Sequence, residues 1–190
     1  MTSKGSCLIV MVTVYIMANI ALNAYANPPS PSEYQLKAVF LYNYAKFVVW
    51  PAESFADADA PIILGVLGKD PFGAIIDQTI KGKTVKGRKL AIKRFEKIED
   101  VEICHILFVS ASEKKHLSKI VKILKGSSVL TVGEVKQFAQ RGGIINFIIK
   151  QNKIRFEINL DAAQQAKLKI SSKLLKLAKI IRDGRRGKEN

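Results

Sequence analysis

The chain has 190 residues, of which 48% are hydrophobic, and it contains 12 glycines and 6 prolines. This composition predicts one compact globular domain and excludes a disordered or low-complexity chain. The formal net charge of +15 would point first to nucleic acid in a cytosolic protein.

The N-terminus has the pattern of a secretory signal peptide. Lys4 gives a positive start, Cys7–Leu22 is almost wholly apolar, and Ala24-Tyr25-Ala26 is a small-x-small cleavage site. We therefore expect residues 1–26 to be removed on export to the periplasm. The alternative is an uncleaved anchor, but the apolar run is shorter than the roughly 20 residues that span a bilayer.

Export changes how the rest of the sequence is interpreted. Residues 27–190 would form the mature domain, and nothing in them has the length and apolarity of a membrane span. Cys104 would be the one cysteine left, so no disulfide within the chain is expected. An exported protein meets acidic proteins and anionic lipids rather than DNA, so we expect no nucleic-acid partner.

The first predicted element of the mature chain is a helix over residues 33–49. Ser30-Pro31-Ser32-Glu33 has the spacing of a capping box with proline at the first helical position. Trp50-Pro51 ends the helix, because a residue before proline is pushed out of the α region.

Downstream, short apolar runs alternate with helical patterns, which indicates βαβ units and a largely parallel sheet. The predicted strands are residues 62–67, 90–94, 103–109 and 129–132. The first leads into a helix ending near Ile80, while Ser110–Glu113 and Thr131–Glu134 have capping-box spacing and predict helices after the last two. Residues 144–149 and 154–158 predict an antiparallel hairpin at one edge of the sheet.

The end of the chain predicts two helices, the first over residues 161–167. The second follows Ser171-Ser172 and carries an apolar stripe of Leu174, Leu175, Ala178 and Ile181. The predicted fold class is therefore α/β: a single three-layer domain with a mostly parallel sheet and an antiparallel edge hairpin.

No catalytic or metal-binding set emerges from the sequence. Cys104, His105 and His116 are the only Cys and His residues after the signal peptide, too few for a metal site without carboxylates. Neighbouring strand residues point to opposite faces, so we expect Cys104 and His105 to be buried structural residues. There is no nucleophile motif, so we expect neither an enzyme nor a cofactor.

One region has the position of a ligand site. Gly68–Gly73 has the glycine spacing of a phosphate loop, but Ala74-Ile75 replace the residues that would touch phosphate and magnesium. Ligands of open α/β sheets bind where parallel strands end. The candidate ligand-binding residues at those ends are Lys69, Asp70, Arg94, Ser110 and Ser112. The other interpretation is that they only form turns and caps.

Nine blocks, in order along the chain, resemble the YfiR-like family. They are Glu33–Ala38, Phe40–Asn43, Ala45–Phe47, Trp50-Pro51, Gly65–Gly73, Cys104–Phe108, Gly142-Gly143, Arg155–Asn159 and Leu168–Ala178. The resemblance implies a periplasmic α/β protein, and the namesake represses a membrane-bound diguanylate cyclase by binding its periplasmic sensor region. The namesake type is tied by disulfides, whereas Cys104 has no partner here, so redox control stays open.

Two functions remain as hypotheses. The first is a regulator that binds the periplasmic region of an inner-membrane signalling protein. Its candidate contacts are the basic run Lys81–Lys97 and the C-terminal Lys173, Lys176, Lys179 and Arg182, which could instead be a solvated face or touch the membrane. The second is a periplasmic carrier or sensor of a small-molecule ligand. The oligomeric state stays open, a homodimer included.

Overall fold

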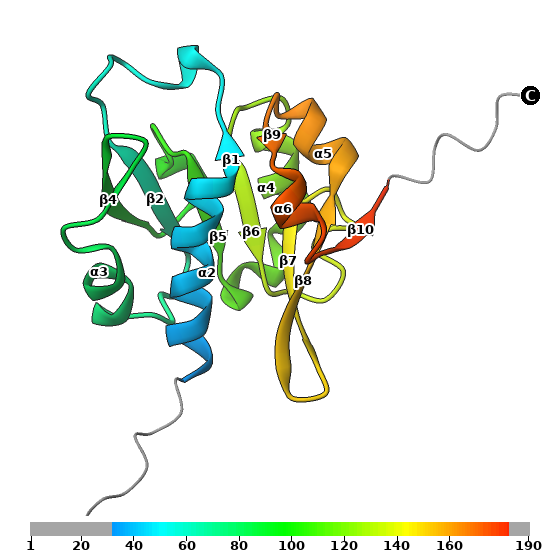
Figure 1. The fold of residues 1–190 in the computed structure, drawn as a ribbon. Coiled ribbons are helices and arrows are strands. Elements are labelled where there is room, and N and C mark those ends of the chain that lie inside the picture. Colours follow the sequence, from blue (N-terminus) through cyan, green and yellow to red (C-terminus); the bar gives the residue numbers. More distant parts are fainter. Residues whose placement is uncertain (1–31, 183–190) are drawn as a thin grey trace, which may run out of the picture. The chain divides into compact units, whose positions relative to one another are not determined.

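The computed structural model describes residues 32–182, and the predicted signal peptide and cleavage site lie outside them. An eight-stranded mixed sheet runs through the domain in the order β10-β8-β7-β6-β5-β2-β4-β3 (Figure 1). Its strands are β2 (Ile62–Leu67), β3 (Thr84–Val85), β4 (Arg88–Phe95), β5 (Ile106–Val109), β6 (Leu130–Gly133), β7 (Ile145–Lys150), β8 (Lys153–Asn159) and β10 (Lys179–Ile181). Strands β4, β2, β5, β6 and β7 are parallel, β3 and β8 are antiparallel to their neighbours, and β10 runs parallel to β8.

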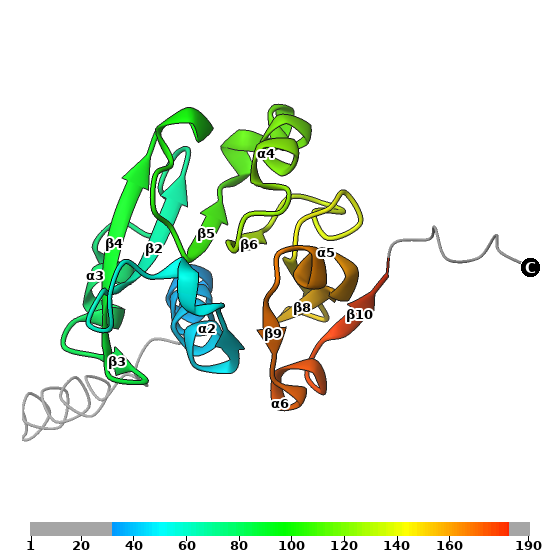
Figure 2. The same cartoon turned by 90° about the horizontal axis from the view of Figure 1, so that it is seen from above.

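Helices cover both faces of the sheet, which confirms the predicted fold class (Figure 2). The helices are α2 (Glu33–Phe47), α3 (Ala74–Ile80), α4 (Leu117–Leu124), α5 (Leu160–Gln165) and α6 (Ser172–Leu175). Helix α2 packs across one face, where the larger core includes the fully buried Leu41, Tyr44 and Phe108. Helix α4 packs on the other face through Leu117 and Ile120, over a smaller core.

Helix α2 begins at residue 33 as predicted, but its N-cap lies two residues after the predicted cap Ser30. Ser32 is the N-cap: its Oγ accepts from the Gln35 backbone N at 3.3 Å, and Gln35 Oε1 accepts from the Ser32 N at 2.5 Å. The helix ends at Phe47, because Val48 and Val49 form β1 and pair with β9 (Lys169–Ile170).

The helix predicted after residue 132 is absent, and residues 134–143 form turns. Thr131 does not cap a helix: its Oγ1 accepts from the backbone N of Ile144 at 2.9 Å. The fully buried Phe138 packs against Gly133 and Gly143, where a Cβ on either glycine would collide with its ring. The helix predicted from the spacing of Thr131 and Glu134 is therefore wrong, because the tertiary packing of Phe138 outweighs the local cap signal.

The cap predicted at Ser110 exists in a shorter form. Ser110 Oγ accepts from the Ser112 N, and a 3₁₀ turn over Ala111–Lys115 precedes α4. The hairpin is present, but it is not at the edge, because β10 adds a further strand beyond β8.

The prediction of a second, longer C-terminal helix is also wrong. Only α6, a single turn, follows Ser171, and the chain then extends into β10. Leu174 is 3% exposed and faces the core, whereas Leu177 is 69% exposed. The apolar stripe does not form one helical face, so the interpretation of a basic helix lying on a membrane has no helix to support it.

Candidate functional site

The five predicted ligand residues gather at the carboxyl ends of β2, β4 and β5. β2 lies between β4 and β5, and the chain leaves it first toward β4 and later returns on the other side to β5. Such a reversal is the usual ligand position of an open parallel sheet. The structure therefore brings the five residues together at one end of the sheet, and their role in ligand binding stays a prediction.

Arg94 and Asp70 form one group there. Arg94 Nε lies 2.7 Å from Asp70 Oδ2, and its Nη2 lies 2.6 Å from Asp77 Oδ2. Hydrogen bonds to Asp77 and then to Asp70 raise the pKa of Arg94. The sequence analysis missed Asp77, which lies in the first turn of α3. This guanidinium is engaged by two carboxylates of the chain itself.

Lys69, Ser110 and Ser112 form a second group through their backbone and hydroxyls. Ser112 Oγ accepts from the Lys69 N at 3.0 Å and donates to Glu113 Oε1 at 3.1 Å. Gly68 has a φ of +83°, and a Cβ there would collide with Ser112 and Glu113. The crevice between the two loops is thus occupied by the protein's own side chains.

A cavity of about 620 Å³ lies one strand further along, at the carboxyl ends of β5, β6 and β7. Lys37 lines it, although its charged side chain is only 4% exposed. Its Nζ lies 2.5 Å from Glu33 Oε1 and 2.5 Å from Glu134 Oε2. Sequence analysis missed this cluster and assigned Glu134 to a helix cap.

The electrostatics of Lys37 favour its charged form. Burial alone would lower the pKa of Lys37, but hydrogen bonds to Glu134 and Glu33 outweigh burial and raise it. The ammonium also lies 4.7 Å from the centroid of the Tyr34 ring. Lys37 therefore joins the N-terminal turn of α2 to the segment after β6.

Glu157 is a buried acid beside this cavity. Its carboxylate accepts from Lys179 Nζ at 2.9 Å and from Gln140 Nε2 at 3.0 Å. Burial would raise the pKa of Glu157, but the hydrogen bonds from Lys179, Gln140 and Asn146 lower it overall. Through Glu157, Lys179 holds the edge strand β10 to β8, and Gln140 holds the segment 134–143 to β8.

The four predicted partner-binding residues differ in their contacts. Lys179 contacts Glu157, and Arg182 Nη1 lies 3.8 Å from Asp161 Oδ1. Lys173 and Lys176 are exposed on and just after α6. A second cavity, of about 1000 Å³, lies between α4 and α5 at the amino ends of the parallel strands, and Arg182 and Arg141 line it.

Cys104 and His105 are buried, on opposite sides of the chain. Burial raises the pKa of the Cys104 thiol to about 12. The His105 ring stacks on Phe55, its Nδ1 accepts from the Ile63 N, and its Nε2 lies 3.0 Å from the Ser54 carbonyl. Within residues 32–182 no group of three His, Cys, Asp or Glu side chains could hold a metal ion. Nor is any helix in that range long and apolar enough to cross a membrane.

Comparisons with known proteins give a family and a fold. A family model described as YfiR/HmsC-like matches residues 34–179. The solved structure of a conserved domain protein from Vibrio cholerae is similar, with a TM-score of 0.54 and 13% identity. The alignment covers 78% of this chain but only 60% of that one, and at this identity the likeness concerns the fold alone. The search of curated proteins gave no match.

Proposed function

Because the chain belongs to the YfiR/HmsC-like family, whose members regulate diguanylate cyclases from the periplasm, we propose that it represses a membrane-bound diguanylate cyclase. It does so by binding the periplasmic sensor region of that enzyme. The observation that carries the proposal is the extent of the family match, residues 34–179, which takes in nearly all of the described fold.

The contacts of the described residues support a binding protein. Two buried charges have partners within the chain: Lys37 pairs with the partly buried Glu134, and Glu157 pairs with the exposed Lys179. The Cys104 thiol is protonated at neutral pH, because its pKa is raised to about 12. This family is regulatory rather than enzymatic, and these groups fit a structural role.

The proposal includes export, with residues 1–26 removed after Ala26. Intact mass of the protein from a periplasmic extract tests this step. A mass that still includes residues 1–26 would contradict it.

The decisive experiment combines capture and deletion. The mature protein, immobilised, is incubated with detergent-solubilised inner membranes, and the retained proteins are identified by mass spectrometry. We expect a retained cyclase, and a higher intracellular cyclic-di-GMP level in a strain that lacks the gene. No retained cyclase together with an unchanged level would refute the proposal.

The cavity of about 620 Å³ supports a second candidate, a small-ligand sensor or carrier. Its volume falls in the range of small-molecule sites, and it lies at the carboxyl ends of parallel strands. Mass spectrometry of the native protein purified from the periplasm tests it. A co-purifying small molecule that is lost on Phe147→Ala, which opens the cavity wall, would favour this function.

A further inference from the structure

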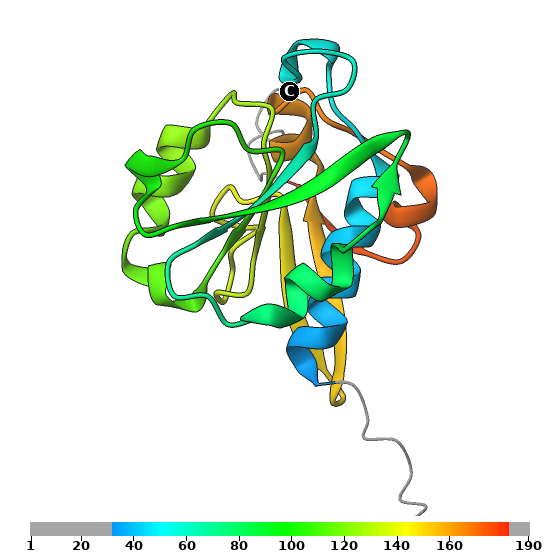
Figure 3. The ribbon, with the colours of Figure 1, turned by 90° about the vertical axis from the view of Figure 1, so that its left-hand side faces the viewer.

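Strand β4 has an outer edge that is mostly unpaired. It pairs with β2 from Leu90 to Phe95, but with β3 only at Arg88 and Lys89. Figure 2 shows β4 at the margin of the sheet, and Figure 3, which looks at this side, shows it running across the front. Within residues 32–182, no strand pairs with the outer side of residues 90–95.

The hydrogen bonds show which backbone groups point outward. The Phe95 carbonyl accepts from the Gly68 N at 2.9 Å, so the N–H and C=O of Phe95 point toward β2. Groups of successive residues alternate between the two sides of a strand. The N–H and C=O of Leu90, Ile92 and Arg94 therefore point away from the sheet, as a template for another strand.

The side chains of β4 also alternate in character. Leu90 and Ile92 are half-buried and contact the core beneath α2 and α3. Lys89 and Lys93 are exposed on the opposite face. Lys93 is 3.7 Å from Glu102, whose side chain is 80% exposed, so this charge is only weakly neutralised.

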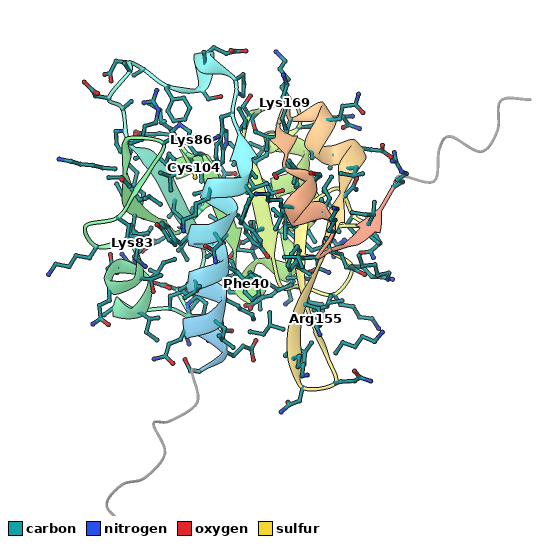
Figure 4. All side chains as sticks on the ribbon, in the orientation of Figure 1. Phe40, Lys83, Lys86, Cys104, Arg155 and Lys169 are labelled. Carbon is teal, nitrogen blue, oxygen red and sulfur yellow. The ribbon has the colours of Figure 1, made fainter. Side chains whose placement is uncertain are left out.

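Further positive charge flanks the edge. Lys83 and Lys86 lie directly before and after β3, and Figure 4 places them on the same side of the molecule as β4. The Lys83 ammonium lies over the Tyr42 ring, and Lys86 Nζ lies 3.5 Å from the Val48 carbonyl. Two copies of β4 pairing with each other would bring their lysines together, which is unfavourable. The edge is thus suited to a strand of opposite charge. β10, at the other edge, is only three residues long, and Lys179 is already paired with Glu157.

We propose that an extended segment of the partner protein, with alternating apolar and acidic side chains, adds to the sheet along β4. Its backbone would pair with the N–H and C=O groups of Ile92 and Arg94. Its acidic side chains would lie beside Lys89 and Lys93. The identity of the partner rests on the function proposed above, whereas the chemistry of the segment rests on β4 itself.

The test uses a synthetic peptide of eight residues that alternates valine with glutamate, and a matched peptide that alternates valine with lysine. Fluorescence anisotropy measures binding, and hydrogen exchange of the ¹⁵N-labelled mature protein locates it. We expect the glutamate peptide to bind and to slow exchange of the Ile92 and Arg94 amides. The lysine peptide should bind at least about tenfold more weakly.

Two test variants, each with a control, separate the contribution of backbone pairing from the contribution of charge. Ile92→Pro removes an outward N–H but no bond to β2, and Ile92→Ala is its control for the lost side chain. Lys89→Glu with Lys93→Glu reverses the charge, and Lys114→Glu with Lys122→Glu makes the same change in net charge on and near α4. Ile92→Pro and the β4 charge reversal should each weaken binding of the glutamate peptide by about tenfold, and the controls by much less. Far-UV circular dichroism checks that each variant is folded.

The outcomes distinguish this inference from the proposed function. Absent binding, equal binding of both peptides, or protection at β10 in place of β4 would overturn it. Concentration-dependent protection of Ile92 in the free protein would also overturn it, because a second copy would then occupy the edge. If the wild type and Ile92→Pro retain the cyclase equally, binding of the partner along β4 is refuted, but the proposed function is not. If the peptide binds at β4 but no cyclase is retained, the proposed function is refuted, but strand addition along β4 is not.

Discussion

Replacing Glu134 with alanine should destabilise the fold strongly, because it leaves a buried ammonium with one partner in place of two. Lys37 is 3% exposed, and its Nζ contacts Glu134 Oε2 at 2.5 Å. Breaking a buried ion pair costs about 3–5 kcal/mol. Glu33 remains, but its side chain is 42% exposed, so that pair contributes only about 0–1 kcal/mol.

The expected loss in the free energy of unfolding is therefore about 2–5 kcal/mol. Urea titration followed by circular dichroism measures it, and Tm should fall by roughly 4–20 °C for a chain of this size. The double variant Lys37→Met with Glu134→Leu is the control. It removes both charges and should restore stability to within about 1 kcal/mol of the wild type.

The effect should also depend on pH in a defined direction. The pKa of Lys37 is raised above its ordinary value of 10.5, so its stabilising contribution is present below that pH and is lost as the pH rises through the raised pKa. The difference between the wild type and Glu134→Ala should shrink at such alkaline pH. A loss below about 1 kcal/mol at pH 7, with the same m-value, would refute the reasoning about Lys37.

Three further predictions follow from buried groups. The pKa of Glu157 is lowered from 4.5, so its contribution is present above that pH and is lost as the pH falls through the lowered pKa; urea melts of Glu157→Gln should show a flatter acid limb than those of the wild type. Cys104, with its pKa raised to about 12, should react with a disulfide reagent at pH 8 only after urea unfolding, and fast labelling of the native protein would contradict its burial. Leu174→Ala should cost about 2–5 kcal/mol in thermal or urea melts. Leu177→Ala, at an exposed position, should change stability by less than about 0.5 kcal/mol, and equal losses would contradict the placement of α6.

The sequence predicted best those elements that local pattern alone determines. The predicted strand over residues 62–67 has the same bounds as β2, because a continuous apolar run lies between Pro61 and Gly68. The helix ending at Ile80 and the hairpin around residues 150–153 were also correct. In these segments the local propensities agree with the final packing.

The errors came where distant residues decide the local structure. Thr131–Glu134 has the spacing of a cap, but the Phe138 ring packs against Gly133 and Gly143, and residues 134–143 form turns. The strand β10 is three residues long, and its pairing with β8 is invisible in a helical pattern of leucines.

The candidate site was predicted in part, for the same reason. The carboxyl ends of β2 and β5 were identified, since they follow apolar strands. Lys37 and Glu134 are 97 positions apart, so their ion pair could not be read from spacing. One signal was present: Lys37 lies four residues before Leu41 on the buried stripe of α2, where a lysine requires a carboxylate.

The pairing of β1 with β9 has a consequence for when the chain can fold. Val48 lies opposite Ile170, and α2 packs Phe40 and Tyr44 on Phe147 and Phe156 of the hairpin. During synthesis the first helix therefore emerges long before the residues that cover it. Its contacts with Phe72 and α3 can form early, but the part of its apolar side that packs on the hairpin stays uncovered until the last third of the sequence is available. The domain therefore cannot complete its core until most of the chain has been made, and an incomplete core is the condition under which a polypeptide can be threaded through a membrane pore before it folds.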